Sequence, residues 1–382
     1  MPEKISFVTK EYGLGKGIPF KERIASDLQL KAWVNRDKEI ERWNKIIENA
    51  VNSKNINFLS FVIGDYGMGK TLALLKVLEA AKLNNKLYAI YLNLISEQKP
   101  KNPGLDVLQR IFKEIDLSRL KVKVKDVALL KKTLPEIGIV LEKIIFGKDT
   151  EEKFLLTSFL CGEIKPSQAQ LKKIGIIRKI ENVEIAKEYL IGILYLLKMS
   201  GYFTLILSLD EFEYLFSLVT KSSQAIYLAL LRGLFDLPAD PRISAEIKNN
   251  MANMVFFIAT SEDGWRRLKD LEEKETSIGG PIVPLMRRVT DKINLKALSK
   301  NDTEKLIEKR LSLDRIKGRY QAEPLIPFNM EFVNYIFKLT QGKPGDIINR
   351  CDHVLDIGIE RRVPRLTSEF AKEVFKERGF SY

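Results

Sequence analysis

The feature that most constrains this chain is a glycine-rich run of eight residues, Gly64-Asp65-Tyr66-Gly67-Met68-Gly69-Lys70-Thr71, which matches G-x-x-x-x-G-K-[ST] at every position. It follows an uncharged apolar run, Asn57–Ile63, and precedes a helical pattern over Thr71–Leu83. In a strand–loop–helix unit of this kind, successive backbone N–H groups and the helix N-terminus surround phosphate oxygens. The sequence therefore predicts a phosphate-binding P-loop.

Each residue of the loop is a predicted contact of a nucleotide, and two have more specific roles. The ammonium group of Lys70 is expected to reach the β- and γ-phosphates, and the hydroxyl of Thr71 is expected to bind Mg²⁺. The predicted ligands are thus ATP and Mg²⁺.

A second apolar run, Thr204–Leu209, ends directly in Asp210 and Glu211. Parallel strands place their carboxyl ends at one edge of a sheet, where ligands bind. We expect Asp210 to hold Mg²⁺ and Glu211 to act as general base for the attacking water. The alternative is an ordinary strand exit with solvated acids. Glu213 either assists the metal site or is a solvated charge.

Two further positions have weaker support from the sequence. Thr260 follows the apolar run Met254–Ala259 and is the preferred sensor that orients the water, with Ser261 second; the alternative is a hydroxyl that caps the next helix. Arg287 and Arg288 lie just before the fifth apolar segment, where AAA+ proteins commonly place an arginine that enters the site of a neighbouring subunit; this resemblance makes Arg288, preferred to Arg287, the candidate arginine finger. The alternative is that both arginines are surface charge.

Five short apolar segments alternate with helical patterns and predict a parallel sheet covered on both faces. These strands are expected at Asn57–Ile63, Leu87–Leu94, Thr204–Leu209, Met254–Ala259 and Ile293–Leu295. A long helical stretch at about 104–200 separates the second strand from the third, and only helices follow the fifth.

The expected fold class is therefore an α/β P-loop NTPase: a three-layer parallel sheet core with a helical insertion and a C-terminal helical lid, which is the AAA+ arrangement. The predicted parts are an N-terminal segment (1–34), the core (35–298) and the lid (299–382).

Composition limits the other classes of function. Two cysteines far apart and a single histidine leave a structural zinc site without ligands. The N-terminus has charges where a secretion signal needs an apolar stretch, and Lys198 interrupts the most apolar region. We expect a cytoplasmic protein with no membrane segment.

The formal net charge of +13 favours an acidic partner, although charge says nothing about fold. The strongest local basic stretch lies in the insertion and consists of Lys165, Lys172, Lys173, Arg178 and Lys179. Such side chains could bind DNA phosphates without reading sequence. The alternative is a solvated basic face.

Residues 20–40, which end in VNRDKEI, resemble the corresponding segment of initiator-type archaeal AAA+ ATPases. This resemblance implies that Val34, Asn35 and Arg36 lie near the adenine. The run from Leu171 to Leu215 resembles the ATP-binding protein family associated with BREX phage defence. In that family a helical insertion leads through a Gly-Tyr step, here Gly201-Tyr202, into an Asp-Glu-x-Glu segment.

Related ATPases often carry a nucleotide-contacting arginine directly after a proline in the lid. Here that position is Gly345, and Arg350, one turn later, is the alternative. The resemblance implies an AAA+ ATPase that works as a homo-oligomer or with a protein partner, in remodelling or loading on DNA or a DNA-associated complex. The alternative function is a nucleotide-gated switch or scaffold that controls a protein partner without binding DNA.

Overall fold

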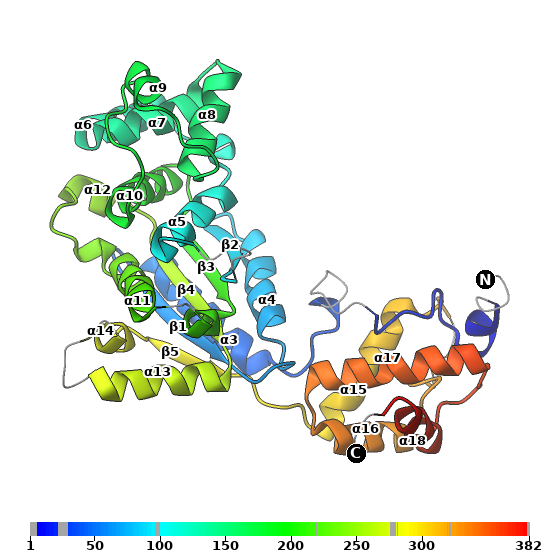
Figure 1. The fold of residues 1–382 in the computed structure, drawn as a ribbon. Coiled ribbons are helices and arrows are strands. Elements are labelled where there is room, and N and C mark those ends of the chain that lie inside the picture. The colour runs from blue at the N-terminus through cyan, green and yellow to red at the C-terminus, as the bar shows by residue number, and fades with distance from the viewer. Residues whose placement is uncertain are drawn as a thin grey trace. The chain divides into compact units, whose positions relative to one another are not determined.

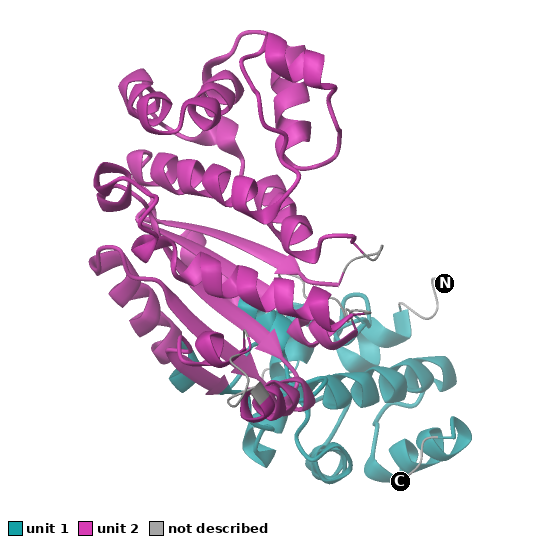
Figure 2. Cartoon of the chain, turned by 60° about the vertical axis from the view of Figure 1, so that its left-hand side comes forward, with its two compact units in different colours: residues 1–40, 64–75, 294–382 teal, residues 41–63, 76–293 magenta. Residues whose placement is uncertain are grey.

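The computed structural model describes residues 6–21, 30–95, 100–217, 220–275, 280, 282–318, 320 and 322–379 (Figure 1). The chain divides into two compact units, coloured in Figure 2. The sheet unit consists of residues 41–63 and 76–293, and the lid unit consists of residues 1–40, 64–75 and 294–382. The lid unit thus contains the P-loop and the N-terminal segment as well as the C-terminal helices.

A five-stranded sheet with the order β2-β3-β4-β1-β5 forms the centre of the sheet unit. The pairings β2–β3, β3–β4 and β4–β1 are parallel. The strands are β1 (Phe58–Ile63), β2 (Leu87–Asn93), β3 (Thr204–Asp210), β4 (Asn253–Thr260) and β5 (Asp291–Asn294). The predicted parallel α/β sheet is therefore confirmed, and each strand boundary lies within two residues of its expected position.

The inner strands β3 and β4 are buried at every residue, which explains why their sequences are mostly apolar and show no alternation. Helix α5 (Pro103–Glu114) packs on β2, and α10 (Val183–Met199) packs on β3. After β3, helix α11 (Lys221–Phe235) packs on α5 and on α14 (Ile282–Met286).

The stretch between β2 and β3 is helical, as predicted (Figure 1). Its other helices are η2 (Leu117–Arg119), α6 (Val124–Thr133), α7 (Pro135–Phe146), α8 (Thr150–Leu160) and α9 (Gln168–Lys173). Helix α10 ends the insertion and is apolar on almost every side because it packs against both the sheet and α5–α7. Within the described residues, no helix has the length and apolar character needed to cross a bilayer.

The remaining helices of the sheet unit are short, apart from α13 (Glu262–Glu275), which follows β4. They are η3 (Phe212–Ser217), η4 (Leu237–Ala239) and α12 (Ala245–Asn249). Two longer helices lie partly in each unit, namely α3 (Asp37–Asn52) and α4 (Lys70–Lys82).

Four helices form the C-terminal part of the lid unit: α15 (Lys300–Asp314), α16 (Met330–Thr340), α17 (Pro344–Arg361) and α18 (Ser368–Glu377). The N-terminal segment, expected to be a separate part, packs into their core through the π-helix η1 (Val8–Tyr12) and the residues after it. Tyr12, Leu14 and Phe20 are fully buried there. The hydroxyl of Tyr12 donates a hydrogen bond to the Val363 carbonyl.

Candidate nucleotide-binding site

The P-loop connects β1 to α4 and is shaped by two glycines with left-handed backbone. Gly67 has φ = +81° and Gly69 has φ = +88°, values that a side chain disfavours. The Lys70 side chain is only 8% exposed, and its Nζ donates to the carbonyl oxygens of Gly64 at 2.9 Å and Asp65 at 3.4 Å. The loop therefore holds a buried ammonium group at the start of a helix, which is the charge arrangement that phosphate binding needs.

The start of α17 contacts this loop within the lid unit. The N–H of Gly345 donates to the Gly67 carbonyl at 2.8 Å. A Cβ atom at position 345 would lie 2.8 Å from the Gly67 Cα, closer than real Cβ contacts occur. A side chain at position 345 would therefore collide with the backbone of the loop. The alternative candidate, Arg350, places its guanidinium 5.1 Å from the centre of the Phe375 ring in α18.

A hollow lined mainly by apolar side chains lies next to the loop, and every residue that lines it belongs to the lid unit. The lining residues are Ala32, Trp33, Val34, Arg36, Met68, Gly69, Leu72, Leu298, Leu306, Arg310, Pro344 and Ile348. An apolar hollow beside a phosphate loop suits a nucleobase. Five of these residues come from the helices and connecting segments after β5. The apolar ones among them, Leu298, Leu306 and Ile348, carry no sequence signal because such positions are equally typical of a core.

The three residues proposed for the adenine side have different environments. Val34 and Arg36 line the hollow together with Met68 and Gly69. Arg36 is 5% exposed and donates to the Lys296 carbonyl at 2.6 Å, and burial lowers its pKa although Glu39 and Asp302 oppose this.

Asn35 is not among the lining residues of the hollow. Its side-chain amide donates to the Asp302 carboxylate, and its backbone φ is +46°. Asparagine tolerates this left-handed conformation better than most residues. The structure thus places Asn35 as a link between the N-terminal segment and α15.

In the sheet unit, the two predicted acids lie at the carboxyl end of β3. Asp210 is 1% exposed, and its Oδ2 accepts a hydrogen bond from the Tyr91 hydroxyl at 2.8 Å. Burial and the Asp210 charge raise the pKa of Tyr91, so the hydroxyl keeps its proton and remains a donor. Sequence reasoning missed Tyr91. The pattern of residues in β2 predicts a strand but does not indicate that this tyrosine contacts Asp210. Tyr91 holds the Asp210 carboxylate in a fixed orientation.

Glu211 has a backbone φ of +57°, which is uncommon for a residue that is not glycine. Its N–H donates to the Asp210 carboxylate at 2.9 Å. Strained backbone of this kind persists where the surrounding structure enforces it and is concentrated at functional sites. The turn directs the chain sharply from β3 into η3.

Thr260 is fully buried at the end of β4, and in the described part of the chain its hydroxyl is among the buried polar atoms with no hydrogen-bond partner. It pairs in register with Ile63, the residue that precedes the P-loop. Ser261, the second sensor candidate, accepts a hydrogen bond from Gly264 N–H at 3.0 Å and so caps α13. Glu213 accepts from the Ser261 N–H at 3.1 Å and ties η3 to the end of β4.

The arrangement of strands and helices is similar to that of two solved structures of one archaeal protein. The ORC2 protein of Aeropyrum pernix in ADPNP-ADP complexes has a TM-score of 0.55 at 14% identity, over 94% of this chain and 71% of that chain. Its ADP form has a TM-score of 0.52 at 14% identity, over 94% and 72%. The chain has the AAA+ fold.

The similarity to BREX proteins is confirmed at the level of sequence. A model of the family described as "BREX system ATP-binding protein BrxC/D" matches residues 125–313, which is just under half of the chain. The match begins after the P-loop and includes the acids of β3. An HTH-type transcriptional regulator of Methanocaldococcus jannaschii, described as uncharacterised, is 31% identical over 98 residues. This stretch covers 26% of the chain and 23% of that relative.

The candidate arginine finger is engaged within its own unit. The Arg288 guanidinium forms a bidentate ion pair with Asp236, with both Nε–Oδ1 and Nη2–Oδ2 at 2.6 Å. Its Nη1 donates to the Pro284 carbonyl at 2.6 Å. The neighbouring Arg287 is exposed. Arg288 would have to leave Asp236 before it could contact a nucleotide bound by another subunit.

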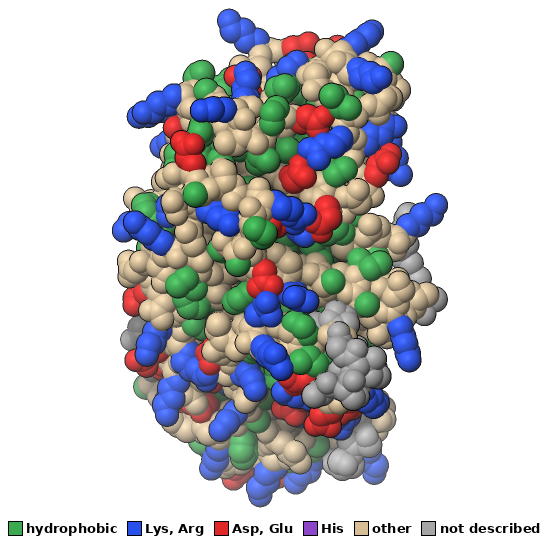
Figure 3. Space-filling model, turned by 90° about the vertical axis from the view of Figure 1, so that its left-hand side faces the viewer, with side chains coloured by type: hydrophobic (Ala, Val, Ile, Leu, Met, Phe, Trp, Pro, Cys, Tyr) green, Lys and Arg blue, Asp and Glu red, His purple; other side chains and the backbone are tan. Residues whose placement is uncertain are grey.

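The basic stretch of the insertion is partly neutralised. Arg178 pairs with Glu136 and with Glu188, each at 2.8 Å, while Lys165, Lys172 and Lys173 are exposed. On the face shown in Figure 3, basic and acidic side chains are interspersed. This pattern gives less support to DNA binding than the sequence alone does.

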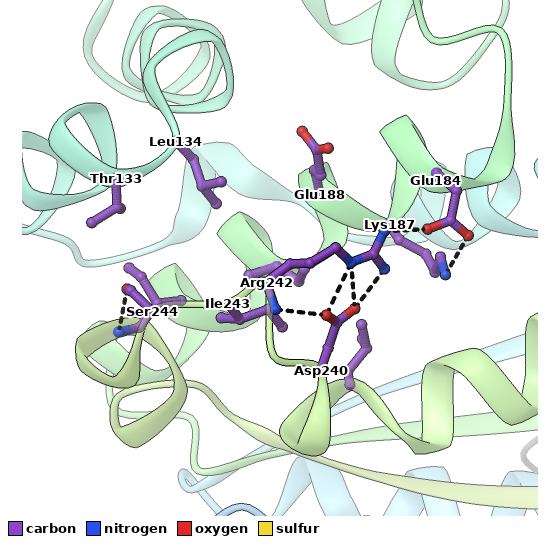
Figure 4. Close-up of a pocket in the computed structure, with 12 residues that line it drawn as sticks. Thr133, Leu134, Glu184, Lys187, Glu188, Asp240, Arg242, Ile243 and Ser244 are labelled. Carbon is purple, nitrogen blue, oxygen red and sulfur yellow. Dashed lines mark hydrogen bonds and ion pairs between the residues drawn. The ribbon is translucent and has the colours of Figure 1, made fainter.

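A separate cavity of about 300 Å³ lies in the sheet unit between α10, the α6–α7 turn and the segment around α12 (Figure 4). Its ionic groups are already paired, because Arg242 contacts both Asp240 and Glu184 and Lys187 contacts Glu184. None of the predicted nucleotide-binding residues lines it.

Proposed function

We propose that this protein binds ATP with Mg²⁺ and hydrolyses it, and that hydrolysis drives remodelling or loading on DNA or on a DNA-associated complex. The observation that carries the proposal is the glycine loop that holds the buried Lys70 ammonium at the start of α4, beside an apolar hollow in the same unit. The ATP-binding description of the matching family and the ADPNP-ADP complexes of ORC2 support it.

In this proposal the backbone N–H groups of residues 64–71 and the Lys70 ammonium bind the phosphates. The ammonium then donates to phosphate oxygens instead of to the two loop carbonyls that accept from it in the structure. β1 and β3 end at the same edge of the parallel sheet with β4 between them, and the P-loop continues directly from β1. Thr71 and Asp210 would hold Mg²⁺, which neutralises charge on the phosphates.

Hydrolysis requires a base and a group that orients water. Glu211 would accept the proton of the water whose oxygen attacks the γ-phosphorus, while the bond to the β–γ bridging oxygen breaks and ADP leaves. The hydroxyl of Thr260 is buried and has no hydrogen-bond partner among the described residues. It is suited to hold that water, because buried polar groups normally have a partner.

The proposed function is tested by measuring ATP binding and the ATPase rate with and without double- and single-stranded DNA. Molecular mass in the presence and absence of ATP would be measured in parallel. A motor acting on DNA predicts turnover that rises with DNA and a larger assembly with ATP. The absence of measurable ATP binding would refute the proposal.

Two observations favour a second candidate, a nucleotide-gated switch that controls a protein partner. Arg178 is paired with two glutamates, and basic and acidic side chains are interspersed on the face shown in Figure 3. That function predicts tight ATP binding, slow turnover and no stimulation by DNA. The same set of measurements therefore separates the two functions.

The arginine finger is a further part of the proposal and can be tested on its own. If Arg288 enters a neighbouring site, Arg288→Ala is expected to lower kcat by about 10³-fold while ATP affinity stays unchanged. Asp236→Asn, which loosens the ion pair, should keep or raise kcat. Arg287→Ala is the matched control at the adjacent exposed arginine. A wild-type kcat in Arg288→Ala would exclude this role.

A further inference from the structure

In the lid unit, the side chain of Lys343 brings a positive charge close to the P-loop. Lys343 lies two residues before Gly345, the position at which related ATPases often carry an arginine. Lys343 is the N-cap residue of α17, and its Nζ lies 4.0 Å from Oδ2 of Asp65, the second residue of the loop. Both side chains are partly exposed, at 41% and 49%. An ion pair with this N–O distance and this exposure contributes little to stability. What matters is that it places the Lys343 ammonium group beside the P-loop.

The backbone fixes this placement more firmly than the ion pair does. Pro344 occupies the first turn of α17, and the Gly345 N–H donates to the Gly67 carbonyl at 2.8 Å. Leu298 N–H also donates to the Gly342 carbonyl at 2.8 Å, which anchors the segment just before Lys343. Backbone hydrogen bonds therefore hold the chain on both sides of Lys343, and the bond made by Gly345 joins it to the P-loop itself.

The contact explains why an arginine is absent at 345. A Cβ there would come within 2.8 Å of Gly67 Cα and 3.2 Å of its carbonyl oxygen, so any side chain would push the lid helix away from the loop. A cation at the start of α17 would therefore have to come from another residue. Lys343 lies two residues earlier, outside the helical turn, and already reaches the loop.

We propose that Lys343 is the residue through which the lid binds the triphosphate, and that Gly345 is required because it lets the start of α17 contact the loop. Asp65 holds the ammonium group when no nucleotide is bound. A triphosphate carries several negative charges and attracts the ammonium more strongly than a single carboxylate does, so Lys343 exchanges Asp65 for phosphate oxygens. The start of α17, with its positive helix end, lies at the same loop.

This inference rests on the proposed ATP binding and can fail independently of it. Lys343→Ala should weaken ATP binding by about tenfold or more, the cost of a charged hydrogen bond, and should weaken ADP binding less. Lys343→Arg should retain most of the affinity. Lys338→Ala, at an exposed lysine of α16, is the matched control and should bind as the wild type does.

A second pair of variants tests the exchange with Asp65. Asp65→Asn should bind ATP at least as tightly as the wild type, because the competing carboxylate is gone. In the double variant with Lys343→Ala, the effect of Asp65→Asn should be smaller than in the wild type if the two side chains compete as proposed. Gly345→Ala should weaken ATP binding while circular dichroism still shows folded protein.

The measurement is the dissociation constant of ATP and of ADP by calorimetry on the full chain. Wild-type binding that is lost in Lys70→Ala but unchanged within twofold in Lys343→Ala would overturn this inference and leave the proposed function intact. Equal losses for ATP and ADP would also overturn it, since the contact would then not depend on the third phosphate. Wild-type protein that binds neither nucleotide would refute the proposed function itself.

Discussion

Lys70→Ala is expected to abolish ATP binding at concentrations where the wild type is saturated. The Lys70 ammonium is buried at the turn of the P-loop, where it donates to two loop carbonyls that a phosphate can displace. Two charged hydrogen bonds to phosphate at about 1.5–3 kcal/mol each correspond to roughly 10²–10⁴-fold in affinity. Calorimetry with ATP would measure this change directly.

The control for this variant lies in the same helix. Lys82 is the exposed last residue of α4, and Lys82→Ala should bind ATP as the wild type does. Circular dichroism of Lys70→Ala should show the wild-type helix content, because the two carbonyls that lose their donor lie in the loop before α4 and take no part in a helix or strand. A folded Lys70→Ala protein with wild-type ATP affinity would contradict the phosphate-binding role of the loop.

The sheet and its order of elements could be predicted because buried parallel strands have a sequence signature of their own. Residues 204–209 and 254–259 are mostly apolar and show no alternation, and both strands are buried at every residue. The P-loop motif between a strand and a helix fixed the position of β1 and α4 in the same way. Local pattern was sufficient here since each signal lies within one short segment.

The place of the N-terminal segment could not be predicted, because its contacts join residues far apart in the sequence. Tyr12 bonds to Val363, and Leu14 forms a bridge with Arg315. A glycine-rich run with scattered apolar residues is typical of a loop, and nothing local shows that three of its side chains are fully buried in the core of the C-terminal helices.

The candidate site shows the same limit at the level of single residues. The sequence indicates which residues carry charge, such as Asp210 and Arg288, but not which partners they have. Tyr91 orients Asp210, and Asp236 binds Arg288, and both partners lie more than 50 residues from the groups they hold. The glycine at 345 appeared from the sequence as a departure from the related ATPases, and only the approach to Gly67 gives it a physical reason.

Glu211→Gln is expected to lower kcat by about 10²–10⁴-fold while ATP binding is retained, because the amide cannot accept the proton of the attacking water. The substitution keeps the size of the side chain, so the turn at φ = +57° and the hydrogen bond from its N–H to Asp210 should persist. Single-turnover ATPase measurements would separate the chemical step from product release.

Glu213→Gln is the matched control, since Glu213 is the other acid after β3. Its carboxylate accepts a hydrogen bond from the Ser261 N–H, and the amide oxygen of glutamine can accept the same bond. Its kcat should stay close to that of the wild type. If both variants lost activity equally, the loss would reflect the geometry of η3 rather than a base at Glu211. If Glu211→Gln hydrolysed ATP at the wild-type rate, proton transfer would have to be assigned to another group. Retained ATP binding with lost turnover in Glu211→Gln alone would locate the chemistry at the turn that ends β3.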